Sequence, residues 1–497
     1  MPENIRALII ILVLAMSIFA FAGQSTHAIF GTVDFTRRRN LWLALTTVAL
    51  LSLNFWVYVL FAIPLLLYAR RRENNPSAMF FFILFALPMD LVQVPGFGLV
   101  QSLFELSHPR LLELFILLPV FLYLRRQSDY IPIGRNLPDK LFVAFLLLTG
   151  ALYFRDFITV TDALRHIIYL FLDAFLPYAV ISRSLKNLQS FRDAVMSFVL
   201  ANMILALVAG AEFYKKWLLY DTLIVALQRG EEITTYLARD GMLRVTASAG
   251  HPIVLGFLMM VSMGLYIFIA RSIGHKFLRR AGMLLLVAGL FVPLSRGPWV
   301  GAAVLMVVYF ATSRYATRSL IGLGFASVLV LSLLAVLPGG EKVINLLPFV
   351  GTTENENIGY RQNLLVNSMI VIQHYPWFGS TDFLKTPELE AMRQGQGIID
   401  IVNSYIAIAL KSGVTGLGLF VGFFGFTIMG ILRAMRTIAD KDSEEYLLGR
   451  VLVATLLAIT VTIVTVSSIL FIPIVYWSVA GLGMAYVQMI RNSHVRT

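Results

Sequence analysis

The chain of 497 residues has no cysteine, and charged residues make up only 14% of it. The missing cysteines exclude disulfides, thiolate catalysis and cysteine-ligated metals. The sequence also lacks a Gly-rich phosphate loop, the HExxH and GxSxG patterns, and the paired acidic motifs with which cytoplasmic enzymes hold a metal-bound nucleotide sugar. We therefore expect neither a nucleotide-dependent reaction nor a metal or other cofactor.

The chain is instead rich in hydrocarbon side chains, with 58% hydrophobic residues and a mean hydropathy of +0.79. A helix of about 20 apolar residues crosses a bilayer core, and it satisfies its own backbone polar groups in lipid. Such runs recur from end to end, so we predict an all-α polytopic membrane protein forming a single membrane domain over residues 1–497. We expect about fourteen transmembrane helices, near residues 6–23, 41–69, 79–99, 109–124, 139–154, 162–182, 190–213, 251–270, 281–294, 298–313, 319–337, 413–432, 447–470 and 474–490.

The formal charge of +12 would suggest a nucleic-acid partner in a soluble protein, but here Lys and Arg mostly follow the ends of apolar runs. Short basic loops mark the cytoplasmic side of a membrane protein, so topology explains the charge and no nucleic acid is expected. With the N-terminus inside, the inner loops collect Arg70–Arg72, Arg125–Arg126, Arg183 with Lys186, Arg271 to Arg280, Arg314 with Arg318, and Arg433 to Lys441. Arg37–Arg39 falls outside in this count, unless the span at 41–69 is broken or re-entrant.

The first apolar run, which follows Arg6 and ends near Ala20-Phe21-Ala22, fits either a membrane anchor or a cleaved signal peptide. We favour the anchor.

Two long segments, residues 215–250 and 338–403, interrupt the spans, and the charge bias places both on the outer face. In the first, Trp217 to Leu227 is predicted to be a helix in the membrane interface, with Trp217 and Tyr220 as anchors. In the second, a helix after Asn357 is predicted to place Leu364, Leu365, Ser368, Met369 and Ile372 on one face.

Three arginines of the outer face are candidates for anion binding. Arg296 lies in Ser295-Arg296-Gly297-Pro298-Trp299, at the junction of two apolar helices with almost no loop between them. A guanidinium there needs a partner: a lipid head group, a nearby carboxylate, or the diphosphate of a substrate. A diphosphate suits the planar fork of the guanidinium group. Arg361 begins the helix of the second outer segment, and Arg244 precedes His251 by seven residues.

His251, which opens the eighth span, is the first candidate for a general base, because imidazole titrates in the range that suits proton abstraction from a sugar hydroxyl. A structural role is the alternative. Further candidates for the base are Asp240, Glu354, Glu356, Asp382, Asp400 and His374. Asp90, Glu105 and Glu113, in or beside the third and fourth spans, are candidate partners for arginine or part of an acceptor path.

The order of these short motifs resembles the O-antigen polymerase and ligase superfamily of bacterial inner-membrane glycan enzymes. The resemblance covers about residues 240–430 and is carried by Arg244 with Gly250-His251-Pro252, Ser295 to Trp299, Tyr360-Arg361-Gln362, His374 to Gly379, Val402 to Ile406, and Lys411 to Leu417. It implies a membrane-embedded, GT-C-like glycosyltransferase with two long periplasmic segments, located in the inner membrane and independent of metal.

The resemblance also implies substrates and site residues. Donor and acceptor would be undecaprenyl-diphosphate-linked glycans in the bilayer, and other polysaccharide assembly proteins would be partners. Arg296 and Arg361 match the donor-diphosphate arginines of the family, with His251 as the third catalytic candidate. Arg244, Gln362, Asn403 and Tyr405 are the candidate substrate-binding residues.

One position departs from the family pattern: ligases commonly have histidine before the asparagine, where this chain has Val402 before Asn403. The Gly250-His251-Pro252 variant is more similar to the exopolysaccharide polymerase branch. We therefore expect a polymerase, with a ligase that moves glycan onto a lipid A core or a protein as the alternative. A transporter or flippase for lipid-linked sugars is the rival outside enzymes, but transporters usually hold polar groups near the bilayer midplane.

Overall fold

The computed structural model describes residues 1–25, 32–96, 98, 102–227, 237–239, 241–336, 344, 355–393 and 397–495. About 76% of the structure is helix. Within these ranges nine helices are long and apolar enough to cross a membrane, and Arg296–Ala311 is a shorter apolar helix. The structure agrees with the predicted all-α polytopic class, whereas the number of fourteen spans is not confirmed.

The N-terminal part of the chain contains ten α-helical segments, two π-helical turns and one β-hairpin. They are α1 (Glu3–Ser25), α2 (Thr32–Ser52), α3 (Phe55–Arg71), α4 (Pro76–Ile83), β1 (Val92–Pro95), β2 (Ser102–Leu106), α5 (His108–Leu112), η1 (Glu113–Leu117), α6 (Leu118–Leu124), α7 (Leu137–Asp156), α8 (Val160–Leu170), η2 (Phe171–Phe175), α9 (Leu176–Ser184) and α10 (Leu188–Lys215). The π-helical turns η1 and η2 join the α-helices on either side into continuous helices.

The C-terminal part holds a second small hairpin and the remaining helices. They are α11 (Asp221–Leu227), β3 (Leu237–Arg239), β4 (Met242–Arg244), η3 (Ala247–Ala249), α12 (Pro252–Ile269), η4 (Ala270–Ser272), α13 (Lys276–Phe291), α14 (Arg296–Ala311), α15 (Ala316–Val336), α17 (Asn355–His374), η5 (Phe383–Lys385), α18 (Pro387–Glu390), α19 (Ser404–Arg436), α20 (Glu444–Thr462) and α21 (Phe471–Val495). Both hairpins are antiparallel.

The predicted span at 41–69 is two helices, not one. Leu53 has a positive φ of 46°, and Asn54 caps α3 by accepting hydrogen bonds from the amides of Trp56 and Val57. α3 then packs back along α2, so that Arg37 and Arg38 at the start of α2 both bond to Glu73 after the end of α3. Arg37–Arg39 therefore lies at the same end of the helices as Arg70–Arg72, which removes the exception to the charge rule.

Because α2 and α3 make two crossings, the N-terminus lies on the opposite side of the membrane from the predicted one. The side-chain amide of Asn4 donates to the carbonyl of Leu50 at 2.9 Å, and the Arg6 guanidinium lies 5.4 Å from the ring centre of Trp217. Leu50 is close to the α2–α3 break, and Trp217 follows α10, so both lie at the end opposite Arg70–Arg72. The expected position of the N-terminus on the basic side was wrong, because α1, α2 and α3 cross three times where two crossings were counted.

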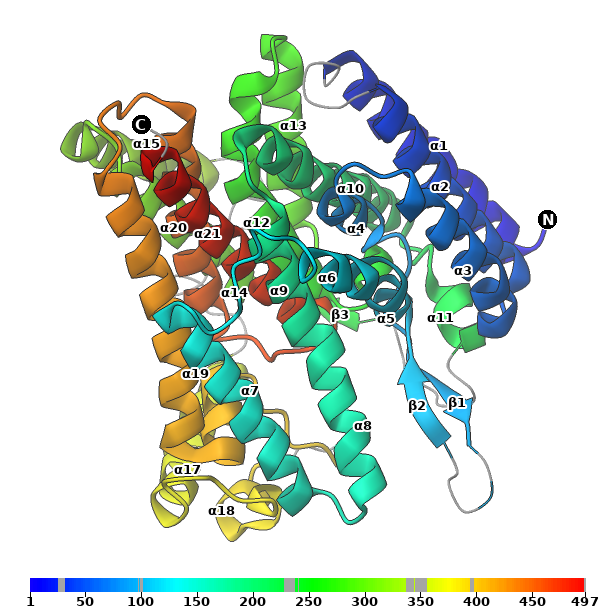
Figure 1. Cartoon of the computed structure of the whole chain (residues 1–497), viewed down its shortest axis with the longest axis vertical. Helices are drawn as coiled ribbons and strands as arrows, with labels where there is room; N and C mark the ends of the chain where they lie inside the picture. The colour runs from blue at the N-terminus through cyan, green and yellow to red at the C-terminus, as the bar shows by residue number, and fades with distance from the viewer. Residues whose placement is uncertain are drawn as a thin grey trace.

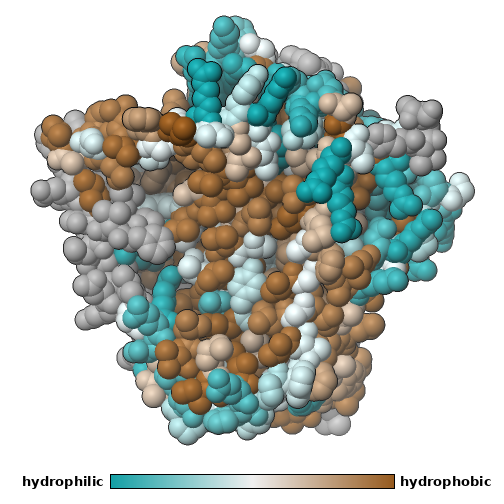
Figure 2. Space-filling view, turned by 90° about the vertical axis from the view of Figure 1, so that its left-hand side faces the viewer, coloured by the Kyte–Doolittle hydropathy of each residue, from teal (hydrophilic) through white to brown (hydrophobic). Residues whose placement is uncertain are grey.

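We call the end of the helices that carries Arg70–Arg72, Arg125–Arg126 and Lys186 the basic face, and the opposite end the motif face. Ion pairs between separate connections hold the basic face together: Arg38 with Asp193, Lys186 with Asp129, Arg192 with Glu444, and Arg314 with Asp442. In Figure 1 the motif face is at the bottom, where α17 and α18 lie. Figure 2 shows a broad hydrophobic band between polar groups at the top and bottom, as expected for a membrane protein.

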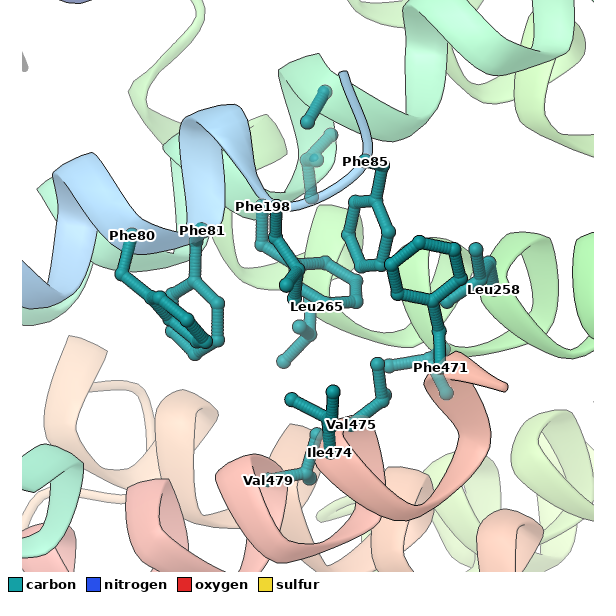
Figure 3. Close-up of a cluster of buried hydrophobic side chains, with 14 of the residues drawn as sticks. Phe80, Phe81, Phe85, Phe198, Leu258, Leu265, Phe471, Ile474, Val475 and Val479 are labelled. Carbon is teal, nitrogen blue, oxygen red and sulfur yellow. The ribbon is translucent and has the colours of Figure 1, made fainter. Parts of the chain in front are cut away.

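The core lies where α4, α10, α12 and α21 meet (Figure 3). Phe85, just after α4, packs edge-on against Phe198 of α10 and Phe471 of α21, with ring centres 5.4 and 5.2 Å apart. Leu258 of α12 and Val475 of α21 are fully buried in the same cluster. Aromatic pairs of this geometry add about 0.5–1.5 kcal/mol each beyond their buried area.

The second outer segment is anchored to the membrane domain near Gly413, whose φ of 67° breaks α19 into two helical parts. Arg155, at the end of α7, donates to the carbonyls of Phe378, Gly379 and Lys411 at 2.8, 3.1 and 2.9 Å. The Val414 amide donates to the carbonyl of Pro376 at 2.7 Å. A side chain at position 413 would meet the backbone of Trp377, so glycine is required where these segments touch.

The predicted amphipathic helix of this segment is α17. Leu364 and Ser368 are buried against the protein, together with Val371, whereas Leu365 and Met369 of the predicted apolar face are almost half exposed. The predicted interfacial helix of the first outer segment begins later than expected, at Asp221. Tyr220 is buried there, and its hydroxyl donates to the carbonyl of Ala86.

Candidate functional site

Arg296 is the first residue of α14, and Ser295 before it is buried. α14 begins against the connection between α20 and α21, which we call the 463–470 loop. A Cβ atom at Gly297 would lie 2.7 Å from Oγ1 of Thr465 and 3.1 Å from Cγ2 of Val466. The glycine of this motif therefore lets α14 approach the 463–470 loop closely, which places half-buried Arg296 beside it.

Arg244 is held against the short connection between α13 and α14. Its Nε and one terminal nitrogen donate to the carbonyl of Pro293 at 3.4 Å and to Oγ of Ser295 at 3.1 Å. Arg239, across the β3–β4 hairpin, donates to the carbonyl of Leu294. The hairpin thus fixes the backbone immediately before Arg296, and Arg244 has a positioning role that the sequence did not reveal.

His251 is the N-cap of α12, and its Nδ1 accepts a hydrogen bond from the amide of Ile253 at 3.2 Å. Burial, with a smaller contribution from the charge of Arg244, lowers the pKa of His251 to about 4. The imidazole is therefore neutral near pH 7. Gly250 lies against the same 463–470 loop, because a Cβ there would be 3.3 Å from Cδ1 of Leu470.

Arg361 lies on α17, next to Tyr360, whose hydroxyl bonds to the backbone of Asp400. Desolvation raises the pKa of the Asp400 carboxyl, although the residue is still partly exposed; the Arg361 charge and the nearby Ser467 side chain oppose the shift. The Ser467 hydroxyl donates to the carbonyl of Ile401, the residue after Asp400, at 3.0 Å. Arg361 and Asp400 are thus neighbours, and Asp400 reaches the 463–470 loop.

Asn403 and Tyr405 are engaged in the fold around the same loop. Asn403 caps α19 by accepting from the amides of Tyr405 and Ile406 at 2.9 and 3.2 Å. The Tyr405 hydroxyl donates to the carbonyl of Thr460 at 2.8 Å. Between them, Ser404 bonds to Ile463, Val466 and Ser468 of the 463–470 loop.

The other sequence candidates are more dispersed. Gln362 is exposed on α17, His374 is exposed at its end, and Asp382 pairs with Lys385 at 2.7 Å. Asp240 and Glu354, and the side chain of Glu356, lie outside the described residues. In the fourth span Arg110 forms two hydrogen bonds with Asp173, at 3.1 and 2.9 Å, and lies 3.9 Å from the carboxylate of Glu105, so Glu105 is a partner of arginine as expected.

The 463–470 loop is the element that sequence reasoning missed. It contacts the motifs around Gly250, Gly297 and Ser404, and it reaches Asp400 through Ser467. Residues 447–470 were expected to form one continuous span, whereas α20 ends at Thr462. The signal was present in Thr462, Thr465, Ser467 and Ser468, because a cluster of hydroxyl residues in an apolar run favours a connection.

Comparison with known proteins adds a second kind of evidence. No curated protein matches the chain. Residues 281–421 match the family model described as O-antigen ligase. This region runs from α13 into α19 and contains Arg296, Arg361, Asn403 and Tyr405, while Arg244 and His251 precede it. The match supports the resemblance of the sequence motifs to the O-antigen polymerase and ligase superfamily.

Proposed function

We propose that this protein polymerises undecaprenyl-diphosphate-linked oligosaccharide repeat units into a surface polysaccharide or exopolysaccharide, at the periplasmic face of a bacterial inner membrane. The O-antigen ligase domain supports glycosyl transfer of the ligase or polymerase type. The observation that carries the proposal is the 463–470 loop, against which the Gly250-His251, Arg296-Gly297 and Asp400-to-Ser404 segments all gather on the motif face.

Arg296 and Arg361 are proposed to bind the donor diphosphate. Arg296 is the first residue of α14, which touches the 463–470 loop, whereas Arg361 is the seventh residue of α17 and lies beside Asp400. A helix N-terminus attracts anions, and guanidinium groups form bidentate, charge-assisted hydrogen bonds with phosphate oxygens. Such bonds contribute about 1.5–3 kcal/mol each, and they accelerate the reaction if they strengthen as the diphosphate departs.

Two features favour Asp400 over His251 as the general base. Desolvation raises the pKa of Asp400, which makes the carboxylate a stronger base than an ordinary aspartate. The pKa of His251 is lowered to about 4, and its Nδ1 already accepts the Ile253 amide, so the neutral ring carries its proton on Nε2. We therefore propose that His251 donates a hydrogen bond to substrate from Nε2 and that Asp400 accepts the proton.

In the proposed reaction, a hydroxyl oxygen of the acceptor glycan attacks the anomeric carbon of the donor. The new glycosidic C–O bond forms as the bond between that carbon and the diphosphate oxygen breaks. The proton of the hydroxyl passes to Asp400, and undecaprenyl diphosphate leaves with its negative charge stabilised by Arg296 and Arg361. The positive charge of the two guanidinium groups takes the part that a metal ion plays in other transferases.

A ligase that transfers the glycan to a lipid A core or a protein is the second candidate, favoured by the description of the matching family. Val402 stands where ligases commonly carry histidine, which favours the polymerase. Deleting the gene and examining the surface polysaccharide separates the candidates. If the protein is a polymerase, the deletion strain makes polysaccharide shortened to one repeat unit. If it is a ligase, the strain makes long chains that are not attached. Polysaccharide of unchanged length and attachment would contradict both candidates.

A further inference from the structure

A cavity of about 360 Å³, lined by both charged and apolar side chains, opens on the basic face, at the end of the molecule opposite the motif face. It forms where three connections meet: the α6–α7 loop, the turn between α9 and α10, and the C-terminal end of α21. A smaller cavity of about 140 Å³ shares Arg135, Gln488 and Asn492 with it. None of the motifs assigned to glycosyl transfer lines either cavity.

Hydrogen-bond donors and positive charge are in excess around this cavity. The two nearby carboxylates are already used, Asp129 by Lys186 at 2.6 Å and Asp139 by Arg183 at 2.5 Å. Arg135 and Arg491 make no hydrogen bond or ion pair with the described part of the chain. Both side chains are exposed, so their guanidinium groups are open to an anionic ligand.

Gln488 points to the same conclusion. Its side-chain nitrogen is buried and has no hydrogen-bond acceptor among the described residues. A buried amide donor without an acceptor is unfavourable, so a bound acceptor at this position would stabilise the protein. Gln488 lines both cavities, as Arg135 does, and Arg491 lines the smaller one.

The rest of the lining indicates what kind of anion fits. Leu124, Leu185 and Met489 contribute apolar surface beside the charged groups. The cavity lies at the end of membrane-crossing helices, level with the connections that carry the other basic residues, where a phospholipid places its phosphate and the first carbons of its chains. Basic pockets between transmembrane helices on the cytoplasmic side are suited to acidic lipid head groups.

We propose that the two adjoining cavities together bind the phosphate-bearing head group of an anionic phospholipid from the leaflet on the basic face, with Arg135, Arg491 and Gln488 as its ligands. The guanidinium groups pair with the phosphate, the Gln488 amide donates to a phosphate or glycerol oxygen, and the apolar residues contact the upper acyl chain. The site is separate from the donor and acceptor sites of the proposed glycosyl transfer.

The test compares the full-length protein with the double variant Arg135→Gln/Arg491→Gln, purified in a neutral detergent. Thermal unfolding and native mass spectrometry would be followed with added phosphatidylglycerol, with zwitterionic phosphatidylethanolamine, and with inorganic phosphate. Arg433→Gln/Arg436→Gln is the matched control, because it removes the same charge from the exposed end of α19 on the same face.

Each Arg near a membrane surface contributes about 1 kcal/mol of attraction to acidic lipid, so we expect phosphatidylglycerol to bind the Arg135/Arg491 variant about 30-fold more weakly and the control almost unchanged. An equal loss in both variants would mean general surface charge and would overturn the site. Stabilisation by inorganic phosphate to the same degree as by phosphatidylglycerol would overturn the lipid assignment, as would equal binding of phosphatidylethanolamine.

Discussion

The hydroxyl group of Tyr360 bonds to both backbone polar groups of Asp400, accepting from its amide at 3.1 Å and donating to its carbonyl at 3.0 Å. This pair of bonds ties α17 to the segment that leads into α19. Because Arg361 follows Tyr360 directly, the same contact keeps the Asp400 carboxyl beside a guanidinium group. Tyr360 is therefore expected to position the proposed base relative to the proposed diphosphate ligand.

Replacing Tyr360 by Phe removes both bonds while keeping the ring. A neutral hydrogen bond contributes about 0.5–1.5 kcal/mol, so we expect polymerisation by the purified protein to slow by about tenfold. The thermal midpoint should change little, because the contact lies on an exposed surface. Tyr375→Phe is the control, since Tyr375 is an exposed tyrosine that follows the same helix. An equal loss of activity in the control would show that Tyr360 has no special role.

Arg296→Ala and Arg361→Ala test the proposed diphosphate ligands. Removing a donor that stabilises transition-state charge typically slows an enzyme by about 10²- to 10³-fold, and we expect that loss for each variant in an assay of chain length with lipid-linked repeat units. Arg393→Ala serves as the control, because Arg393 lies in the same outer segment but pairs with Glu390 at 2.7 Å on the surface. Long-chain product from the Arg296→Ala protein would exclude that residue from the mechanism.

The proposed base predicts the pH dependence of the reaction. Asp400 must be ionised to accept a proton, so the rate should fall as the pH drops through its pKa, which lies above the usual carboxyl value near 3.9. Asp400→Asn should lower the rate by about 10²- to 10⁴-fold and abolish this acidic limb. A pH–rate profile of the Asn variant that keeps the wild-type limb and rate would assign the base elsewhere.

The sequence named the candidate residues but not how the fold brings them together. Arg296 was a candidate because a guanidinium at membrane depth is costly, Arg361 because it lies near a predicted helix start, and His251 because imidazole titrates in a suitable range. Asp400 was one of seven candidates for the base, His251 included, since nothing local distinguishes a solvated carboxylate from one that the fold brings to Ser467. Its selection depends on the contact between the Asp400–Ile401 segment and the 463–470 loop, which joins residues more than 60 positions apart.

The fold, like the site, was predicted in part from the sequence. Hydropathy identified most of the helices, because the bilayer imposes their length and composition. It failed at Leu53 and at Thr462, where hydrophobic runs continue through a change of direction. Asn54 was a usable signal for the first break, because asparagine favours the N-cap position. The close approach of Gly297 to Thr465 had no local signal, since it depends on how α14 packs against α20.

His251 has two roles that substitutions can separate. Asn at this position keeps an oxygen that can cap α12, whereas Ala removes the cap at a cost of about 0.5–2 kcal/mol. We expect His251→Asn to retain most of the thermal stability at pH 7 but to polymerise poorly, because it lacks the Nε2 donor. Full activity in the Asn variant would limit His251 to its structural role.

The lowered pKa of His251 also predicts the pH dependence of stability. The folded-state pKa is about 4 and the unfolded value about 6.5, so the unfolded chain binds the proton more tightly. The stability that neutral His251 contributes is complete above pH 6.5 and is lost as the pH falls towards 4. Between pH 7 and pH 5 the thermal midpoint of the wild type should therefore fall more than that of His251→Asn, and equal falls would contradict the burial of the imidazole.

Membrane sidedness can be measured directly, because the chain has no cysteine and each single-cysteine variant gives one label. Lys385 has a highly exposed side chain beside α18 on the motif face, and Lys441 is exposed between α19 and α20 on the basic face. We expect Lys385→Cys to react with an impermeant maleimide from the periplasm and Lys441→Cys only after the inner membrane is permeabilised.

Glu3→Cys should behave like Lys385→Cys, because the break at Leu53 gives three crossings before Arg70. Labelling of Lys385→Cys from the cytosol alone would rule out a periplasmic reaction, whereas the same result for Glu3→Cys would contradict the packing of Arg6 against Trp217 and leave the proposed site intact.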